Sequence, residues 1–136
     1  MHTNELFDRV LSLRSALKRT YVDPEEIEIE NPNDPDEEGL CYILCEIMED
    51  IRNIIENIDY HSSPIVTEGV LRKNEIGRYE LNGREFTCGR CLEVLIPASD
   101  YRPAYWTYCR IEGNEHGYFL VGYPNLSIDG LRARLR

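Results

Sequence analysis

Large aliphatic residues recur at alternating spacings of four and three between positions 40 and 58, and this periodicity constrains the fold more than any other feature. The residues of this seam are Leu40, Leu44, Ile47, Ile51, Ile54 and Ile58. Such spacing places them on one side of an α-helix that packs along another helix at a shallow angle. Asp34 is a favourable N-cap, Pro35 suits the first helical position, and Glu37 completes a capping-box spacing. We therefore predict a helix from residue 35 to about residue 59, with its seam in the core.

A shorter amphipathic helix is predicted before it, over residues 4–20, with Thr3 as its N-cap. Its apolar residues are again spaced by four and three: Leu6, Val10, Leu13 and Leu17. The two helices are expected to pair as a hairpin. The longer helix carries a second apolar stripe, made of Cys41, Cys45, Met48 and Ile55. A helix that is apolar on two adjacent sides is covered on both, so we expect the C-terminal half of the chain to cover the second side.

The pattern changes from helix to strand in the C-terminal half. Asn82-Gly83 is a strong signal for a type I′ hairpin between the β-rich segments 77–81 and 84–87. Strand character recurs at residues 92–96, 105–111, 118–121 and 131–135. About six short strands joined by Gly-rich turns predict a small antiparallel barrel. The expected fold class is therefore α+β, with an acidic helical hairpin at residues 1–62 packed on a small antiparallel β-barrel at residues 63–136.

Several blocks of this half, taken in order, resemble a family of unknown function. They are Gly77-Arg78-Tyr79-Glu80-Leu81, Cys88-Gly89 with Leu92-Glu93-Val94-Leu95, Cys109-Arg110-Ile111-Glu112, Gly117–Val121 and Gly130–Arg134. The resemblance covers about residues 70–136 and is to short proteins of Gram-positive bacteria and mobile elements. It implies an SH3-like barrel but brings no activity and no catalytic residues. Small acidic proteins joined to such modules are similar in style to anti-CRISPR inhibitors.

Acidic residues are concentrated in the N-terminal half. The first sixty residues hold sixteen acidic and five basic residues, a formal charge of −11, whereas residues 61–136 come to +1. Nine carboxylates and no cation lie between positions 23 and 38: Asp23, Glu25, Glu26, Glu28, Glu30, Asp34, Asp36, Glu37 and Glu38. Such a surface repels nucleic acid and attracts basic proteins. We predict that it binds a partner and that the chain does not bind nucleic acid directly. The alternative is that these residues only keep the protein soluble.

The cysteines suggest a metal site. Cys88-Gly89-Arg90-Cys91 is one half of a zinc-ribbon knuckle, and Cys41 and Cys45 at positions i and i+4 can chelate one ion from a helix face. The sequence therefore predicts a zinc ion held by these four thiolates, which would join the longer helix to the barrel.

Other arrangements of the cysteines stay open. Cys109 or His116 could complete a zinc site within the barrel, or all five cysteines could be buried free thiols. Cys109 is in register with Ile111, so we expect it to be buried in the barrel. An odd number of cysteines in a chain without a signal peptide or membrane span fits a reducing cytoplasm.

The sequence does not indicate an enzyme, since it has no P-loop, GxSxG or HExxH motif and its histidines are isolated. An aromatic group surrounds Arg102: Tyr101, Tyr105, Trp106 and Tyr108. It could stack on single-stranded nucleic acid or anchor a protein, but packing is the favoured interpretation.

Two functions follow as hypotheses. The first is a non-enzymatic acidic inhibitor that binds a basic nucleic-acid-handling nuclease, such as a CRISPR effector, and blocks DNA loading. The alternative is a regulatory or structural interaction module of a mobile element or phage, with the barrel as its recognition surface.

Overall fold

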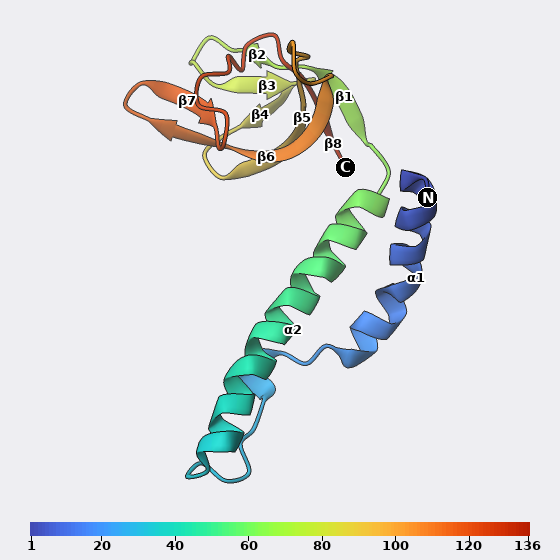
Figure 1. Ribbon diagram of the computed structural model, residues 1–136. Coiled ribbons are helices and arrows are strands. Elements are labelled where there is room, and N and C mark those ends of the chain that lie inside the picture. The colour runs from blue at the N-terminus through green and yellow to red at the C-terminus, as the bar shows by residue number, and fades with distance from the viewer. The chain divides into compact units, whose positions relative to one another are not determined.

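The chain divides into a helical unit, Met1–Ser63, and a sheet unit, Pro64–Arg136, in a computed structural model that describes all 136 residues. The first unit contains all the α-helices and the second contains all the strands (Figure 1). The fold class is therefore α+β, as the sequence predicts. The predicted boundary, between residues 62 and 63, lies one residue before the division between these units. Neither helix combines the length and hydrophobicity that a membrane span requires.

The helical unit consists of α1 (Thr3–Thr20), the 3₁₀ helix η1 (Pro24–Glu26) and α2 (Pro35–Ser62). Both predicted helices are present, and the Asp34 carboxylate caps α2 by accepting the Asp36 N–H at 3.0 Å. The N-cap of α1 is His2 and not Thr3. The reason is that Glu5 reaches back one turn and accepts the His2 backbone N–H at 2.9 Å, which places the helix start one residue earlier.

The two helices do not pair through their predicted seams. Arg14 of α1 forms a two-point ion pair with Asp59 of α2, and the Val22 N–H lies 3.4 Å from Met48 Sδ. These contacts place the second stripe of α2 against α1 and the connection that follows it. The prediction that the seam lies in the core is wrong for its outer residues: the exposed fractions are 54% for Leu40, 43% for Ile47 and 44% for Ile54.

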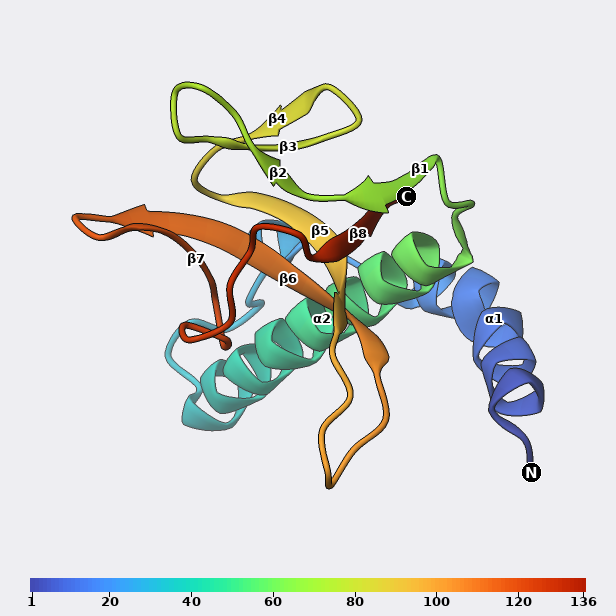
Figure 2. The same ribbon diagram turned by 90° about the horizontal axis from the view of Figure 1, so that it is seen from above.

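The sheet unit contains eight strands in two antiparallel sheets. Their bounds are β1 (Thr67–Val70), β2 (Arg72–Lys73), β3 (Tyr79–Leu81), β4 (Arg84–Phe86), β5 (Arg90–Ile96), β6 (Tyr105–Asn114), β7 (Gly117–Leu120) and β8 (Arg132–Leu135). One sheet has the order β1-β8-β5-β6-β7 and the other has the order β2-β3-β4, to one side of the first (Figure 2). The expected closed barrel is not confirmed, because the strands form two separate sheets.

One core fills the sheet unit. Leu92 and Val94 of β5 are fully buried, as is Ile111 of β6. Phe86 and Leu81 of the small sheet belong to the same cluster, so both sheets share this core. The predicted strands form near their expected positions, whereas β1 and β2 have no counterpart in the sequence-based prediction.

The turn at Asn82-Gly83 has the predicted type I′ character, because both residues have positive φ values, 49° and 82°. The Asn82 side-chain amide also donates to Thr67 Oγ1 at 2.8 Å and to the Glu68 carbonyl at 3.1 Å. It therefore bonds the β3–β4 hairpin to β1 of the other sheet. A Cβ at Gly69 would lie only 2.9 Å from Asn82 Oδ1, which explains the glycine at that position.

Candidate functional site

Residues 23–38, which we call the acidic connection, are held in place by their own carboxylates. Asp23 caps η1 by accepting the Glu25 N–H at 3.0 Å, and Asp34 caps α2. Glu37 accepts the backbone N–H groups of both Glu30 and Asn31, the latter at 3.0 Å. This carboxylate therefore bonds to the loop and not to the Asp34 N–H that a capping box would supply.

Five of the nine carboxylates project from this segment and accept no hydrogen bond. They are Glu25, Glu26, Glu28, Glu30 and Asp36, all exposed. The remaining carboxylate of the nine, that of Glu38, is half-buried and accepts a hydrogen bond from the Tyr42 hydroxyl, which raises the pKa of Tyr42. Ile27 and Ile29 are half-buried between exposed glutamates, although this stretch forms no strand. The fold thus separates an apolar side from an acidic side in this stretch.

Cys41 and Cys45 lie one turn apart on α2 and are both half-buried. Partial burial raises the pKa of the Cys41 thiol, and its hydrogen bond with Cys45 and the nearby Glu38 and Glu37 charges raise it further. Both thiols are therefore close enough to bind one ion, but metal binding would have to displace the Cys41 proton, which burial and the nearby acidic residues retain.

Cys88 lies in the turn before β5 and Cys91 lies in β5 of the sheet unit, and both are exposed. Gly89 between them has a φ of 83°, which allows the tight turn that the knuckle interpretation requires. Cys91 hydrogen-bonds to Tyr108 on β6 and raises the pKa of Tyr108 to about 12. The alternative that all five thiols are buried is wrong for this pair.

Cys109 is buried next to Ile111, as predicted, and burial raises the pKa of its thiol to about 11. Within either unit, no group of three or more His, Cys, Asp or Glu side chains is assembled to hold a metal ion. The two cysteine pairs belong to different units. The four-thiolate zinc site therefore stays a prediction of the sequence.

The aromatic group around Arg102 is partly packed. Tyr105 shares a 3.1 Å hydrogen bond with Tyr123, and Arg102 lies over the Tyr105 ring at 5.2 Å. Trp106 is half-buried, with the Arg134 guanidinium 4.1 Å from its ring centre. Tyr101 differs, because it is 99% exposed on the loop that joins β5 to β6. Packing therefore explains Tyr105 and Trp106 but not Tyr101.

A buried carboxylate in the sheet unit was not predicted. Glu93 on β5 is only 3% exposed and forms ion pairs with Arg134, at 3.2 Å, and with Arg136, at 2.9 Å. Burial alone would raise the pKa of Glu93, but the hydrogen bonds from the two arginines hold it below its usual value. The signal in the sequence is the alternation of arginine with apolar residues from Arg132 to Arg136, in β8 and the residue after it, which supplies two cations to Glu93.

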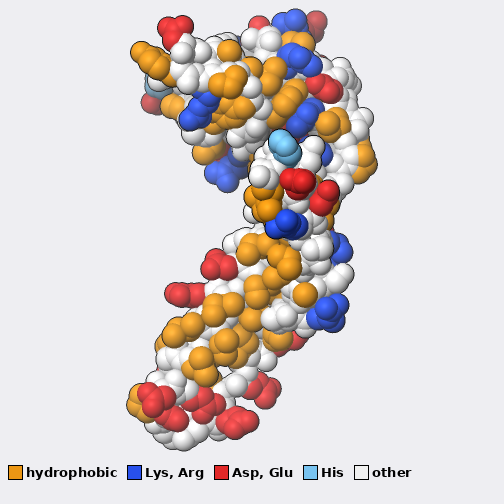
Figure 3. All heavy atoms as spheres, turned by 45° about the vertical axis from the view of Figure 1, so that its right-hand side comes forward, with side chains coloured by type: hydrophobic (Ala, Val, Ile, Leu, Met, Phe, Trp, Pro, Cys, Tyr) orange, Lys and Arg blue, Asp and Glu red, His pale blue; other side chains and the backbone are white.

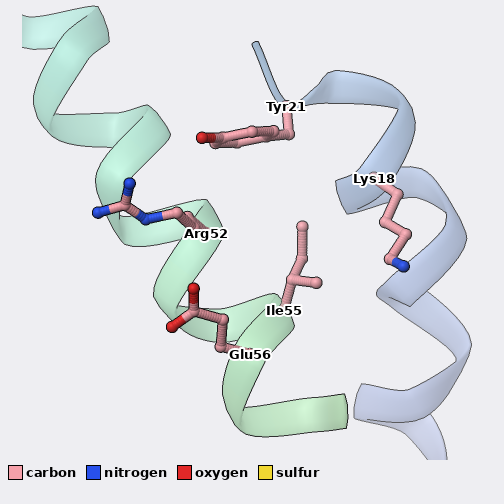
Figure 4. A pocket seen from close by; sticks show the side chains of 5 residues that line it. All are labelled: Lys18, Tyr21, Arg52, Ile55 and Glu56. Atoms are coloured by element: carbon pink, nitrogen blue, oxygen red, sulfur yellow. The ribbon is translucent and has the colours of Figure 1, made fainter. Parts of the chain in front are cut away.

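A pocket of about 380 Å³ lies between α1 and α2. Figure 4 shows Ile55 pointing into the space between the helices, with Tyr21 at one end. The other lining residues are Lys18, Arg52 and Glu56, and Arg52 forms an ion pair with Glu49. With charges of both signs and one cation already paired, this pocket does not specify a charged ligand.

Residues 69–135 match the model of a protein family described as a domain of unknown function, DUF5348. The match covers most of the sheet unit and none of the helical unit. The C-terminal half therefore carries a domain of an uncharacterised family, as the resemblance of its sequence blocks implied. No curated protein and no solved structure matches the chain.

Proposed function

We propose that the protein is a non-enzymatic inhibitor that binds a basic protein through the acidic connection. The observation that supports this proposal is that five carboxylates project from a segment with no cation, while Asp23, Asp34 and Glu37 hold its backbone in place. A segment whose conformation is already fixed loses less conformational entropy when it binds.

Carboxylates accept charge-assisted hydrogen bonds from lysine and arginine, the same side chains that hold nucleic-acid phosphates. A protein that presents several carboxylates can therefore compete for a channel that normally holds nucleic acid. CRISPR effectors hold their heteroduplex in such a positively charged channel. We propose an effector of this kind as the partner and obstruction of DNA loading as the mechanism. The protein itself would not bind DNA or RNA.

The experiment is a binding measurement with the full-length chain and a candidate effector at rising NaCl concentration. The test variant changes Glu25, Glu26, Glu28 and Glu30 to Gln. We expect at least tenfold slower association and a flatter salt dependence than for the unmodified protein.

The matched control changes four exposed carboxylates outside the acidic connection: Asp8→Asn, Glu75→Gln, Asp100→Asn and Glu115→Gln. It removes the same formal charge, so a local role predicts a much smaller effect. If both variants slowed association equally, the effect would come from the total charge of the protein and not from the acidic connection. Unchanged binding by the test variant would move the interface away from this segment.

A second candidate function is a regulatory or structural interaction module of a mobile element that recognises its partner with the sheet unit. Tyr101 favours it, because a tyrosine that is 99% exposed on a projecting loop (Figure 2) is the kind of residue that anchors protein interfaces. Tyr101→Ala should then weaken partner binding, whereas the inhibitor hypothesis predicts no change.

A further inference from the structure

The helical unit has an apolar face that its two helices leave partly open to solvent. Two seam residues of α2 immediately precede a position that contacts α1 or the connection: Ile47 precedes Met48, and Ile58 precedes Asp59. The same holds on α1, where Leu13 precedes Arg14. One residue turns an α-helix by about 100°. Each seam is therefore rotated sideways out of the contact between the helices.

The two seams are rotated toward the same side. The helices are antiparallel, because Arg14 contacts Asp59 whereas Val22, further along the chain, contacts Met48 earlier in α2. Two facing right-handed helices that run in opposite directions turn their preceding positions to one common side. The apolar face is thus made of Leu6, Val10, Leu13 and Leu17 from α1 and Leu40, Leu44, Ile47, Ile51 and Ile54 from α2, whereas Ile58 of the same seam is buried. Figure 3 shows hydrophobic side chains gathered along the helical unit, with carboxylates around the acidic connection.

Much of this face is open to solvent. The exposed fractions are 52% for Leu6 and 55% for Leu13, similar to those of Leu40, Ile47 and Ile54. Ile43, beside the seam, is 55% exposed. These residues leave on the order of 500 Å² of apolar surface, the size at which exposed patches mark interaction sites. The only buried residues of the unit are Met48 and Ile58, so its own core is small.

We propose that a second copy of this chain covers the apolar face, so that two helical hairpins form a four-helix bundle. A standard interface buries about 800 Å² on each partner, which this face and its polar margin can supply. A single docking helix would fill one groove, whereas the face presents one apolar stripe from each of two helices. A second hairpin offers two stripes of the same lengths and spacing, as the helices of a bundle require.

The charge of the chain gives this contact a distinctive dependence on salt. Each N-terminal half carries a formal charge of −11, so two copies repel each other through solvent. Salt screens this repulsion, and the dimer should therefore become tighter as salt is added. Binding of the acidic connection to a basic partner has the opposite dependence. The dimer does not rest on the proposed inhibitor function.

The test is sedimentation equilibrium of the full chain from low micromolar concentration to 1 mM protein, at 0.05 and 0.5 M NaCl. We expect a dimer whose dissociation constant is at least tenfold lower at the higher salt concentration. A monomer throughout this range would overturn the proposal, whether the face is then used by another protein or by none. Because this measurement uses the unmodified protein, it does not depend on the folding of any variant.

Variants then locate the contact. Leu13→Ser combined with Ile47→Ser should raise the dissociation constant at least a hundredfold, with the circular dichroism of the helices retained. Ile76→Ser, at an aliphatic residue of the sheet unit that is 70% exposed, is the matched control and should leave the dimer intact. A dimer that tolerates the double variant would overturn the proposed face.

The Gln variant of Glu25, Glu26, Glu28 and Glu30 separates this proposal from the inhibitor function. It removes four charges from each copy, so it should tighten the dimer while it weakens binding to a basic partner. A weaker dimer in this variant would contradict the proposed contact, whereas unchanged partner binding would contradict only the inhibitor function.

Discussion

At the scale of single residues, Glu93 is the polar group on which the sheet unit depends most. Its carboxylate is paired with Arg134 and Arg136, whose side chains are only 16% and 15% exposed. Removal of one partner from a buried ion pair costs more than the pair contributes, because the remaining charges stay desolvated.

Glu93→Gln should therefore lower the free energy of unfolding by about 2–3 kcal/mol, somewhat less than for a fully enclosed pair because the two arginines keep contact with water. Urea denaturation measures this loss. Glu115→Gln is the matched control, since the Glu115 side chain is 86% exposed and its loss should change stability by less than about 0.5 kcal/mol.

Glu93 should also give the protein a specific sensitivity to acid. Its pKa is lower in the folded protein than in the unfolded chain, so its contribution is complete above the unfolded value of about 4.3 and is lost as the pH falls through the lower folded value. Urea denaturation between pH 3 and 6 should show stability falling below about pH 4.3. The fall should be smaller in Glu93→Gln, and an equal fall in both proteins would assign it to other carboxylates such as Asp59.

At the scale of elements, local chemistry made much of the structure predictable. The caps and turns, such as Asp34 and Asn82-Gly83, act within a few residues, and β6 alternates buried with exposed residues at Cys109–Ile111. What the sequence did not predict depends on distant partners. The heptad pattern of α2 identifies an apolar side of the helix but not the element that packs against it. The Arg14–Asp59 ion pair, which determines which side of α2 faces α1, spans 45 positions in the sequence. The pairing of Glu93 could not be predicted because its two arginines lie some 40 positions away in the sequence.

One element-scale prediction concerns the loop before α2. Glu37 accepts the N–H groups of Glu30 and Asn31, so Glu37→Ala should release that part of the acidic connection without unfolding the helix. Hydrogen exchange at these two amides should become at least tenfold faster. The control is Asp36→Ala, whose exposed carboxylate accepts no hydrogen bond. Equal exchange in both variants would show that the Glu37 bonds do not order the loop.

At the scale of the whole molecule, the zinc prediction is decided by elemental analysis of the purified chain. If Cys41, Cys45, Cys88 and Cys91 bind zinc, the protein should contain about one zinc per chain, as a four-ligand structural site requires. Cys88→Ser should lose the metal. The buried Cys109 is the control, and Cys109→Ala should keep it. A metal-free unmodified protein would leave Cys88-Gly89-Arg90-Cys91 as an ordinary turn.

The side chain of Asn82, in the turn between β3 and β4, joins the two sheets through hydrogen bonds to β1. Asp-Gly forms a type I′ turn as readily as Asn-Gly, so Asn82→Asp looks neutral for the β3–β4 hairpin. A carboxylate, however, cannot donate to Thr67 Oγ1 and the Glu68 carbonyl, and it would instead face that carbonyl with like charge. Conversion of this single amide to an acid, whether by mutation or by slow hydrolysis during storage, would therefore remove both hydrogen bonds between the β3–β4 turn and β1, while every strand remained formed. Because the strands are retained, circular dichroism would not detect this chemical change at Asn82.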